Sequence, residues 1–144
     1  MNVSAKSEYG LRSLIVLAHR ASEGLVPARQ IAEACGVPLK YLEQILKALR
    51  EGGLVEGQVG AAGGYRLTRP PRFITAGDAI RLLDERLGLA DLPGEGRAAT
   101  GSTPGLQRLW TRVEGAIADV LYSTTLADLC ADEEPDLARR PAVS

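Results

Sequence analysis

The chain has 144 residues, of which 45% are hydrophobic, and it carries a formal net charge of −1 at pH 7. This length suits one modest domain with a smaller additional unit, and the absence of a run of roughly 18 apolar residues excludes a membrane span from the sequence. The start MNVSAKSEYG lacks the basic and then apolar pattern of a signal peptide, so we expect a cytoplasmic protein.

The small net charge conceals a division between the two halves of the chain. Residues 1–75 carry ten Lys and Arg against six Glu, whereas residues 76–144 carry seven Arg against twelve acids. A basic half of this kind is typical of a protein in which one end meets phosphate groups. Counts this small also arise by chance.

A first helix is predicted from Ser4, a suitable N-cap, to about Ala21. Its apolar residues recur at the i, i+3, i+4 and i+7 spacing of a buried helix face. His19 is the only histidine of the chain and falls in the last turn, where we expect it to have a structural role. The apolar residues of this face are Leu11, Leu14, Ile15 and Ala18.

Two short helices follow between residues 28 and 49, with a tight turn at Gly36. Glycine adopts the positive φ that ends a helix, and Pro38 suits the first position of the second helix. The inner faces are marked by Ile31, Ala32 and Cys35 in the first helix and by Leu39, Leu42, Ile45, Leu46 and Leu49 in the second.

The outer side of the second helix is polar and can reach base edges and phosphates. We therefore predict a helix-turn-helix in which this is the recognition helix. Its candidate DNA-binding residues are Lys40, Tyr41, Glu43, Gln44 and Lys47.

A glycine-tipped hairpin is predicted next, with one strand over residues 54–59, a turn over residues 60–64 and a return strand over residues 65–68. The pair Pro70-Pro71 ends it, because proline cannot continue a ladder. The glycine-rich turn is not followed by a GK[ST] sequence, which argues against nucleotide binding. Instead, Gly63 and Gly64 are predicted to let backbone N–H groups approach a DNA phosphate.

Thr75, with Asp78 three residues later, resembles a capping box for another helix, and Ile80, Leu83 and Leu87 mark its buried face. The glycine-rich stretch Gly88 to Pro104 is then predicted to be a flexible loop whose order depends on a partner or effector.

A long helix is predicted from Pro104 to about Ser123, followed by a short helix over residues 126–131 that Thr125 caps. The long helix carries a narrow apolar seam, which predicts pairing with a second copy of the chain; the other interpretation is packing on the domain's own core. The seam consists of Leu106, Leu109, Val113, Ile117 and Val120.

These segments predict a mainly α-helical fold with a small β-hairpin. Residues 1–75 form a winged helix-turn-helix domain, residues 76–131 form a connecting helix, a loop and a dimerisation helix, and residues 132–144 have the composition of a disordered tail.

The order of three segments, VPLKYLEQIL, REGGLV and GAAGGYRLTRPP, resembles the Rrf-type winged-helix regulators. The resemblance extends from about Ser4 to Leu129 and includes the starting YGLRSL and the closing STTLADL. It implies a dimer that binds double-stranded DNA and regulates transcription.

The resemblance also raises the question of a cofactor, since many Rrf-type regulators hold an iron-sulphur cluster with three cysteines in the loop that is here Gly88 to Pro104. That loop contains no cysteine. Glu8 falls where some relatives supply a fourth ligand, but one carboxylate cannot hold a cluster without thiolates. We therefore expect no cofactor and no metal site. We also expect structural roles for Cys35 and Cys130, while a redox role for Cys130 stays open.

Family members without a cluster respond to small ligands, thiol chemistry or partner proteins, so the resemblance implies an effector at the same loop. A second departure lies in the hairpin, where relatives often place an arginine just before the glycine turn and this chain has Val59. Arg66 or Arg69 would then supply the phosphate contact.

Together, these expectations describe a homodimeric repressor that reads a pseudo-palindromic operator with half-sites roughly 34 Å apart. No catalytic constellation is present in the sequence, so we do not expect an enzyme. The alternative function is a winged-helix protein-interaction module with weak or no DNA binding.

Overall fold

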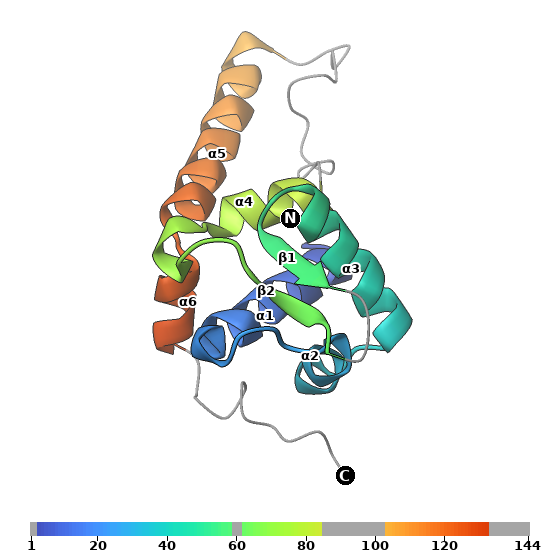
Figure 1. Ribbon diagram of the computed structural model, residues 1–144. Coiled ribbons are helices and arrows are strands. Elements are labelled where there is room, and N and C mark those ends of the chain that lie inside the picture. Colours follow the sequence, from blue (N-terminus) through green and yellow to red (C-terminus); the bar gives the residue numbers. More distant parts are fainter. Residues whose placement is uncertain (1–2, 59–61, 85–102, 133–144) are drawn as a thin grey trace.

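The computed structural model describes residues 3–58, 62–84 and 103–132. Figure 1 shows a compact group of helices with a two-stranded hairpin, from which one long helix, α5, projects. This confirms the predicted mainly α-helical winged-helix fold. The predictions for Val59, Leu87, most of the Gly88 to Pro104 loop and the tail beyond Asp132 fall outside the described residues.

Helix α1 (Ala5–His19) lies behind the hairpin and contributes a continuous buried face to the core. Ser4 caps it as predicted, because its hydroxyl accepts a hydrogen bond of 3.1 Å from the Ser7 N–H. The helix ends at His19 instead of near Ala21, and the short 3-10 helix η1 (Ala21–Glu23) follows. The prediction overran because residues of a 3-10 turn still look helical in sequence.

Helices α2 (Ala28–Cys35) and α3 (Leu39–Glu51) form the predicted helix-turn-helix. Gly36 ends α2 in the left-handed conformation at φ 68°, as the turn requires. Pro38 is the N-cap of α3 and not its first residue. The inner faces of both helices are buried in the core, although Leu39 is 36% exposed. The buried residues are Ile31, Ala32, Ala34 and Cys35 of α2 and Leu42, Ile45, Leu46 and Leu49 of α3.

Strands β1 (Val55–Gln58) and β2 (Gly64–Leu67) form the predicted antiparallel hairpin, which we call the wing. The register pairs Val55 with Leu67 and Glu56 with Arg66. Tyr65 also exchanges two 2.8 Å backbone hydrogen bonds with Val26, just before α2. This bridge joins the wing to the entrance of the helix-turn-helix.

Helix α4 (Ala76–Leu83) follows the 3-10 turn η2 (Pro71–Phe73) and lies between α1, α3 and α5. The predicted capping box is present, because the Thr75 hydroxyl accepts from the Asp78 N–H and the Asp78 carboxylate accepts from the Thr75 N–H. A Cβ atom at Gly10 of α1 would collide with Leu83, so the two helices cross closely at that glycine.

Helix α5 (Pro104–Ser123) has the predicted bounds, with Pro104 in its first turn, and α6 (Leu126–Asp132) extends one residue beyond the prediction. None of the residues of α5 is buried, whereas Leu126 of α6 is completely buried. Within the described part of the chain, no helix is long and apolar enough to cross a membrane.

Candidate nucleic-acid interface

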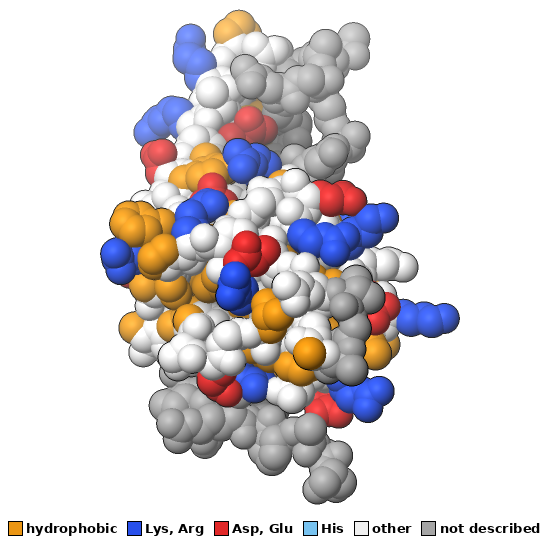
Figure 2. Space-filling model, viewed as in Figure 1, with side chains coloured by type: hydrophobic (Ala, Val, Ile, Leu, Met, Phe, Trp, Pro, Cys, Tyr) orange, Lys and Arg blue, Asp and Glu red, His pale blue; other side chains and the backbone are white. Residues whose placement is uncertain are grey.

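The outer side of α3 is polar, exposed and supported from below by a packed core. Lys40, Glu43, Gln44 and Lys47 are all exposed, while the opposite side of the helix is completely buried. Figure 2 shows Lys and Arg side chains projecting from the side of the molecule that α3 forms, with acidic side chains between them. A rigid helix with this division of faces can enter a major groove.

Tyr41, predicted on the same outer side, lies at its border. Its ring is half-buried against the core and meets the ring of Tyr9 on α1 edge to face, with centroids 6.0 Å apart. This aromatic contact fixes the start of α3 on α1. The role of Tyr41 in positioning the helix could not be predicted from helical spacing alone, because the ring reaches across to a residue 32 positions earlier.

The first turn of α3 also has backbone N–H groups that could bind an anion such as a phosphate group. Pro38, its N-cap, makes no side-chain capping hydrogen bond. The N–H groups of the first turn are therefore without a side-chain cap, and they add to the charge of Lys40 at the positive end of the helix dipole. Sequence reasoning could have found this signal, since proline has no side-chain acceptor.

The two glycines predicted to contact phosphate differ in position. Gly63 is half-buried in the turn of the wing, whereas Gly64 is buried within β2. A Cβ atom at Gly64 would lie 2.6 Å from the Val26 carbonyl carbon and oxygen. Gly64 thus lets the wing lie close to the segment before α2. This packing is sufficient to explain why the position is a glycine, and no phosphate contact is needed to explain it.

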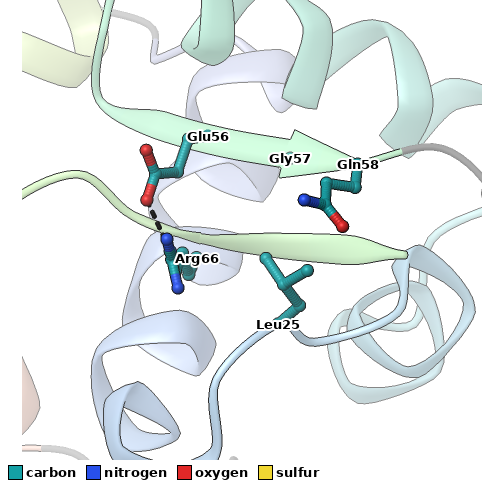
Figure 3. Close-up of a pocket in the computed structure, with 5 residues that line it drawn as sticks. All are labelled: Leu25, Glu56, Gly57, Gln58 and Arg66. Carbon is teal, nitrogen blue, oxygen red and sulfur yellow. Dashed lines mark hydrogen bonds and ion pairs between the residues drawn. The ribbon is translucent and has the colours of Figure 1, made fainter. Parts of the chain in front are cut away.

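Arg66 projects from β2 and forms an ion pair with Glu56, its direct cross-strand partner (Figure 3). Both side chains are half exposed, at 55% and 52%. They line a small pocket of about 170 Å³ together with Leu25, Gly57 and Gln58. Ligand sites for small molecules usually enclose roughly 300 Å³ or more, so we assign no ligand to this pocket.

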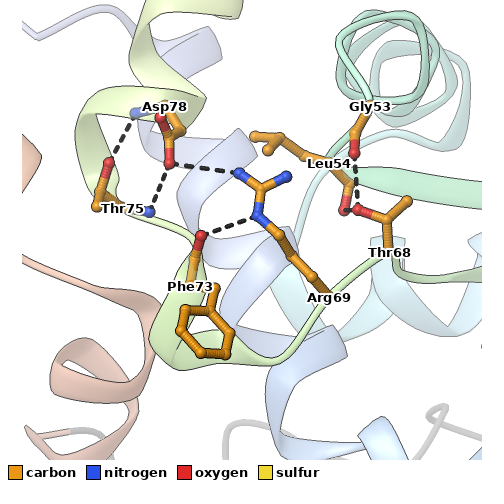
Figure 4. Close-up of polar contacts among 7 residues, drawn as sticks. All are labelled: Gly53, Leu54, Thr68, Arg69, Phe73, Thr75 and Asp78. Atoms are coloured by element: carbon orange, nitrogen blue, oxygen red, sulfur yellow. Dashed lines mark hydrogen bonds and ion pairs between the residues drawn. The ribbon is translucent and has the colours of Figure 1, made fainter.

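Arg69 lies just beyond the wing and is held by two acceptors (Figure 4). Its Nε donates a 2.8 Å hydrogen bond to the Phe73 carbonyl, and its Nη2 lies 3.5 Å from Asp78 Oδ2. The side chain is 40% exposed. Both arginines predicted to contact phosphate therefore have partners within the chain.

The predicted seam on α5 is accessible along most of its length. Leu106, Leu109 and Val120 are 46%, 44% and 63% exposed, while Val113 and Ile117 are half-buried. Near the end of the helix, the Tyr122 ring lies against Gly77 of α4, where an added Cβ would be 2.6 Å from Tyr122 Cδ1. The helix is thus attached to the rest of the chain near its C-terminal end, and Figure 1 shows its N-terminal half standing away from the other helices.

The two cysteines are on separate helices. Cys35 is buried on α2, with its Sγ 3.8 Å from the Ser13 hydroxyl, and Cys130 is half-buried on α6. Burial raises the pKa of the Cys35 thiol, although the Ser13 hydrogen bond and the Arg12 charge oppose that shift. A buried, protonated thiol is a poor nucleophile and a poor metal ligand at neutral pH.

A helix-turn-helix whose second helix has an exposed polar side, followed by a wing, defines the class of winged helix-turn-helix proteins. The pattern of the Rrf2 family, described as "Iron-dependent Transcriptional regulator", matches residues 3–132. The chain belongs to the Rrf2 family and is a transcriptional regulator of that type, for which DNA binding is implied.

Two curated relatives support this assignment. CymR of Bacillus subtilis is 38% identical over 131 residues, which cover 91% of each chain, and IscR of Vibrio parahaemolyticus is 32% identical over 134 residues, which cover 93% of this chain and 80% of the relative. Both are named as HTH-type transcriptional regulators. The solved structure of B. subtilis CymR, titled the global cysteine regulator, superposes with a TM-score of 0.80 at 36% identity and covers 93% of this chain and 99% of that chain.

The family description raises the question of iron, and the donor set of this chain does not fit an iron-sulphur cluster. Such clusters are held chiefly by cysteine thiolates, and the whole sequence has two cysteines, of which Cys35 is buried in the core. Glu8 is exposed and pairs with Arg12 at 3.3 Å. Within the described ranges, no group of three or more His, Cys, Asp or Glu residues could hold a metal ion.

Proposed function

We propose that this regulator is a homodimeric, sequence-specific repressor in which the α3 helices of two copies enter successive major grooves of a pseudo-palindromic operator. The observation that carries the proposal is the outer side of α3. Its exposed residues combine donors (Lys40, Lys47), an acceptor (Glu43) and an amide (Gln44) over a completely buried inner side. Such a set matches the donors and acceptors that base-pair edges present in a major groove.

The dimer is supported by the apolar seam of α5. Leu106, Leu109 and Val120 leave large parts of their surface in water, on one side of a helix that has no buried residue. A second copy of the same helix would cover this seam symmetrically. Repression is the simplest outcome of such binding, because a dimer that occupies promoter DNA excludes other proteins from it.

In this proposal the protomer meets phosphate through Lys40, Lys47 and Arg66, with the turn of the wing at Gly63 nearby. Arg66 would exchange Glu56 for a phosphate group when the wing reaches DNA. An effector acting through the stretch from Gly88 to Pro104 would regulate binding. Since the thiolates for a cluster are lacking, we propose that this effector is not an iron-sulphur cluster.

The competing proposal is a protein-interaction module with weak or no DNA binding. It is favoured by one observation, the intramolecular partners of Arg66 and Arg69, which reduce the positive charge that the wing presents.

The two proposals differ in the salt dependence of DNA binding. Three basic side chains in each of two protomers amount to six phosphate contacts, for which log Kobs should fall against log salt with a slope of about −5. The test is a fluorescence titration of a promoter fragment, taken from the genomic DNA that the purified protein retains, between about 50 and 200 mM salt. Binding that is absent, or that does not change with salt, would support the interaction module.

A further inference from the structure

Arg69 connects the end of the wing to the start of α4. Its guanidinium uses two different edges, Nε for the Phe73 carbonyl and Nη2 for the Asp78 carboxylate. Asp78 is itself fixed, because its Oδ2 accepts a 3.0 Å hydrogen bond from the Thr75 N–H within the capping box. Figure 4 shows the Arg69 side chain extending from the wing toward these groups.

The residue before Arg69 fixes the same end of the wing to α3. The Thr68 hydroxyl donates to the Gly53 carbonyl at 2.6 Å, with the Leu54 carbonyl at 3.2 Å, and the Thr68 N–H donates to the Leu54 carbonyl at 3.1 Å. Gly53 and Leu54 follow α3 after Gly52, the C-cap of that helix. Thr68 and Arg69 thus hold the end of the wing between the recognition helix on one side and α4 on the other.

The segment that Arg69 contacts is joined in turn to α5. The Ala76 N–H donates a 2.8 Å hydrogen bond to the Thr124 carbonyl, and the Leu126 N–H donates one of 2.8 Å to the Ile74 carbonyl. Both bonds lie at the connection between α5 and α6, next to the Tyr122 ring that rests on Gly77. Direct contacts therefore lead from the wing, through Arg69, to the C-terminal end of the proposed dimerisation helix.

We propose that Arg69 is a positioning residue that sets the orientation of the wing relative to α5, and with it the half-site spacing that a dimer accepts. The inference rests on the proposed function, since spacing has meaning only for two copies on one operator. If Arg69 turned to a phosphate group, the Phe73 carbonyl and the Asp78 carboxylate would both lose their contact with its guanidinium. Arg66 is better placed for phosphate, because it projects from β2 and its partner is an exposed carboxylate.

Lysine cannot replace arginine in this role. A single ammonium group is a point charge, whereas the two guanidinium edges reach a carbonyl and a carboxylate in a fixed geometry. Arg69→Lys therefore keeps the positive charge and loses the geometry. A phosphate contact would tolerate the same substitution.

The probes for the experiment are a short duplex that the wild-type protein selects from a random pool and the same duplex with one base pair inserted at its centre. Full-length wild type, Arg69→Lys and Arg69→Ala are titrated against both duplexes at several salt concentrations. Arg72→Lys is the matched control, because Arg72 is exposed in the adjacent turn and its guanidinium carbon lies 4.6 Å from the centre of the Phe73 ring.

Wild type and Arg72→Lys should prefer the selected duplex over the expanded one by about tenfold or more, and Arg69→Lys should reduce that preference to about threefold or less at an unchanged salt slope. The inference is overturned if Arg69→Lys keeps the wild-type preference, or if Arg69→Ala lowers the salt slope by about 2, as the loss of one phosphate contact in each of the two protomers would. Should Arg69→Ala fail to fold, Arg69→Lys decides the question. A wild-type protein that selects no duplex refutes the proposed function itself, so the two failures are distinguishable.

Discussion

Leu109 offers the sharpest test of the proposed dimer, because it lies on the α5 seam and is 44% exposed in the single chain. Its replacement by aspartate should leave the folding of the protomer almost unchanged and separate the two copies. Val113 and Ile117 are less suitable, since both are half-buried within their own chain and their substitution would also disturb the protomer.

The expected change in the stability of the dimer follows from the part of the Leu109 side chain that is still exposed in the single chain. Full burial of a leucine contributes about 1.5 to 3 kcal/mol, so the exposed part of Leu109 corresponds to about 1 kcal/mol in each protomer. A two-fold interface contains the residue twice, and each buried aspartate without a partner adds a desolvation cost of about 1 kcal/mol or more. The total of at least about 4 kcal/mol raises the dissociation constant of the dimer about a thousandfold.

Sedimentation velocity over a range of protein concentrations measures this change directly. The matched control is Gly115→Asp, which places the same charge on the side of α5 away from the seam, where an added Cβ has no neighbour within 4 Å. We expect monomeric Leu109→Asp with a wild-type circular dichroism spectrum, and dimeric Gly115→Asp. A soluble Leu109→Asp dimer of wild-type stability would refute the seam as the interface.

Three further predictions concern the DNA contacts and the cofactor. Glu56→Gln should free Arg66 from its ion pair and strengthen DNA binding more than Glu51→Gln at the end of α3 does, at an unchanged salt slope; equal affinities of the two variants would contradict a masked phosphate contact. In titrations against single-base variants of the operator, Lys40→Ala should weaken all sites equally, whereas Glu43→Ala should lose about 1 to 3 kcal/mol of preference at one base pair; unchanged preferences would make Glu43 an ordinary solvated residue. Protein purified without oxygen should be colourless, and stoichiometric iron with a visible absorbance band would contradict the cluster-free assignment.

Local signals in the sequence were sufficient for most of the elements. The Pro104 to Ser123 helix was predicted with its observed bounds, because proline in a first turn and a regular apolar seam act within one segment. The capping box of Thr75 and Asp78 is likewise local, as is the left-handed turn at Gly36. Pro38 was misplaced by one residue because proline is common both before and at the start of a helix.

The partners of individual side chains could not be predicted, because they depend on how the elements pack. Arg66 meets Glu56 only in the observed register of the wing, and Arg69 reaches Asp78 only after the chain has turned at the two prolines. Position 64 requires a glycine because the Val26 backbone lies so close to it, and the sequence alone gives no sign of this contact. The outer side of α3 and the seam of α5 stay predictions, since their partners are other molecules.

Sequencing the duplexes that the wild-type protein retains from a random pool tests the central claim most directly. Two copies that use their α3 helices together should enrich an inverted repeat whose half-site centres lie about 10 base pairs, roughly 34 Å, apart. A Glu43 substitution should change the base selected at the same position in both halves, whereas Lys40→Ala should leave the selected sequence unchanged. A pool without enrichment, or a single motif without two-fold symmetry, would contradict the proposal of a dimer that reads its operator through α3.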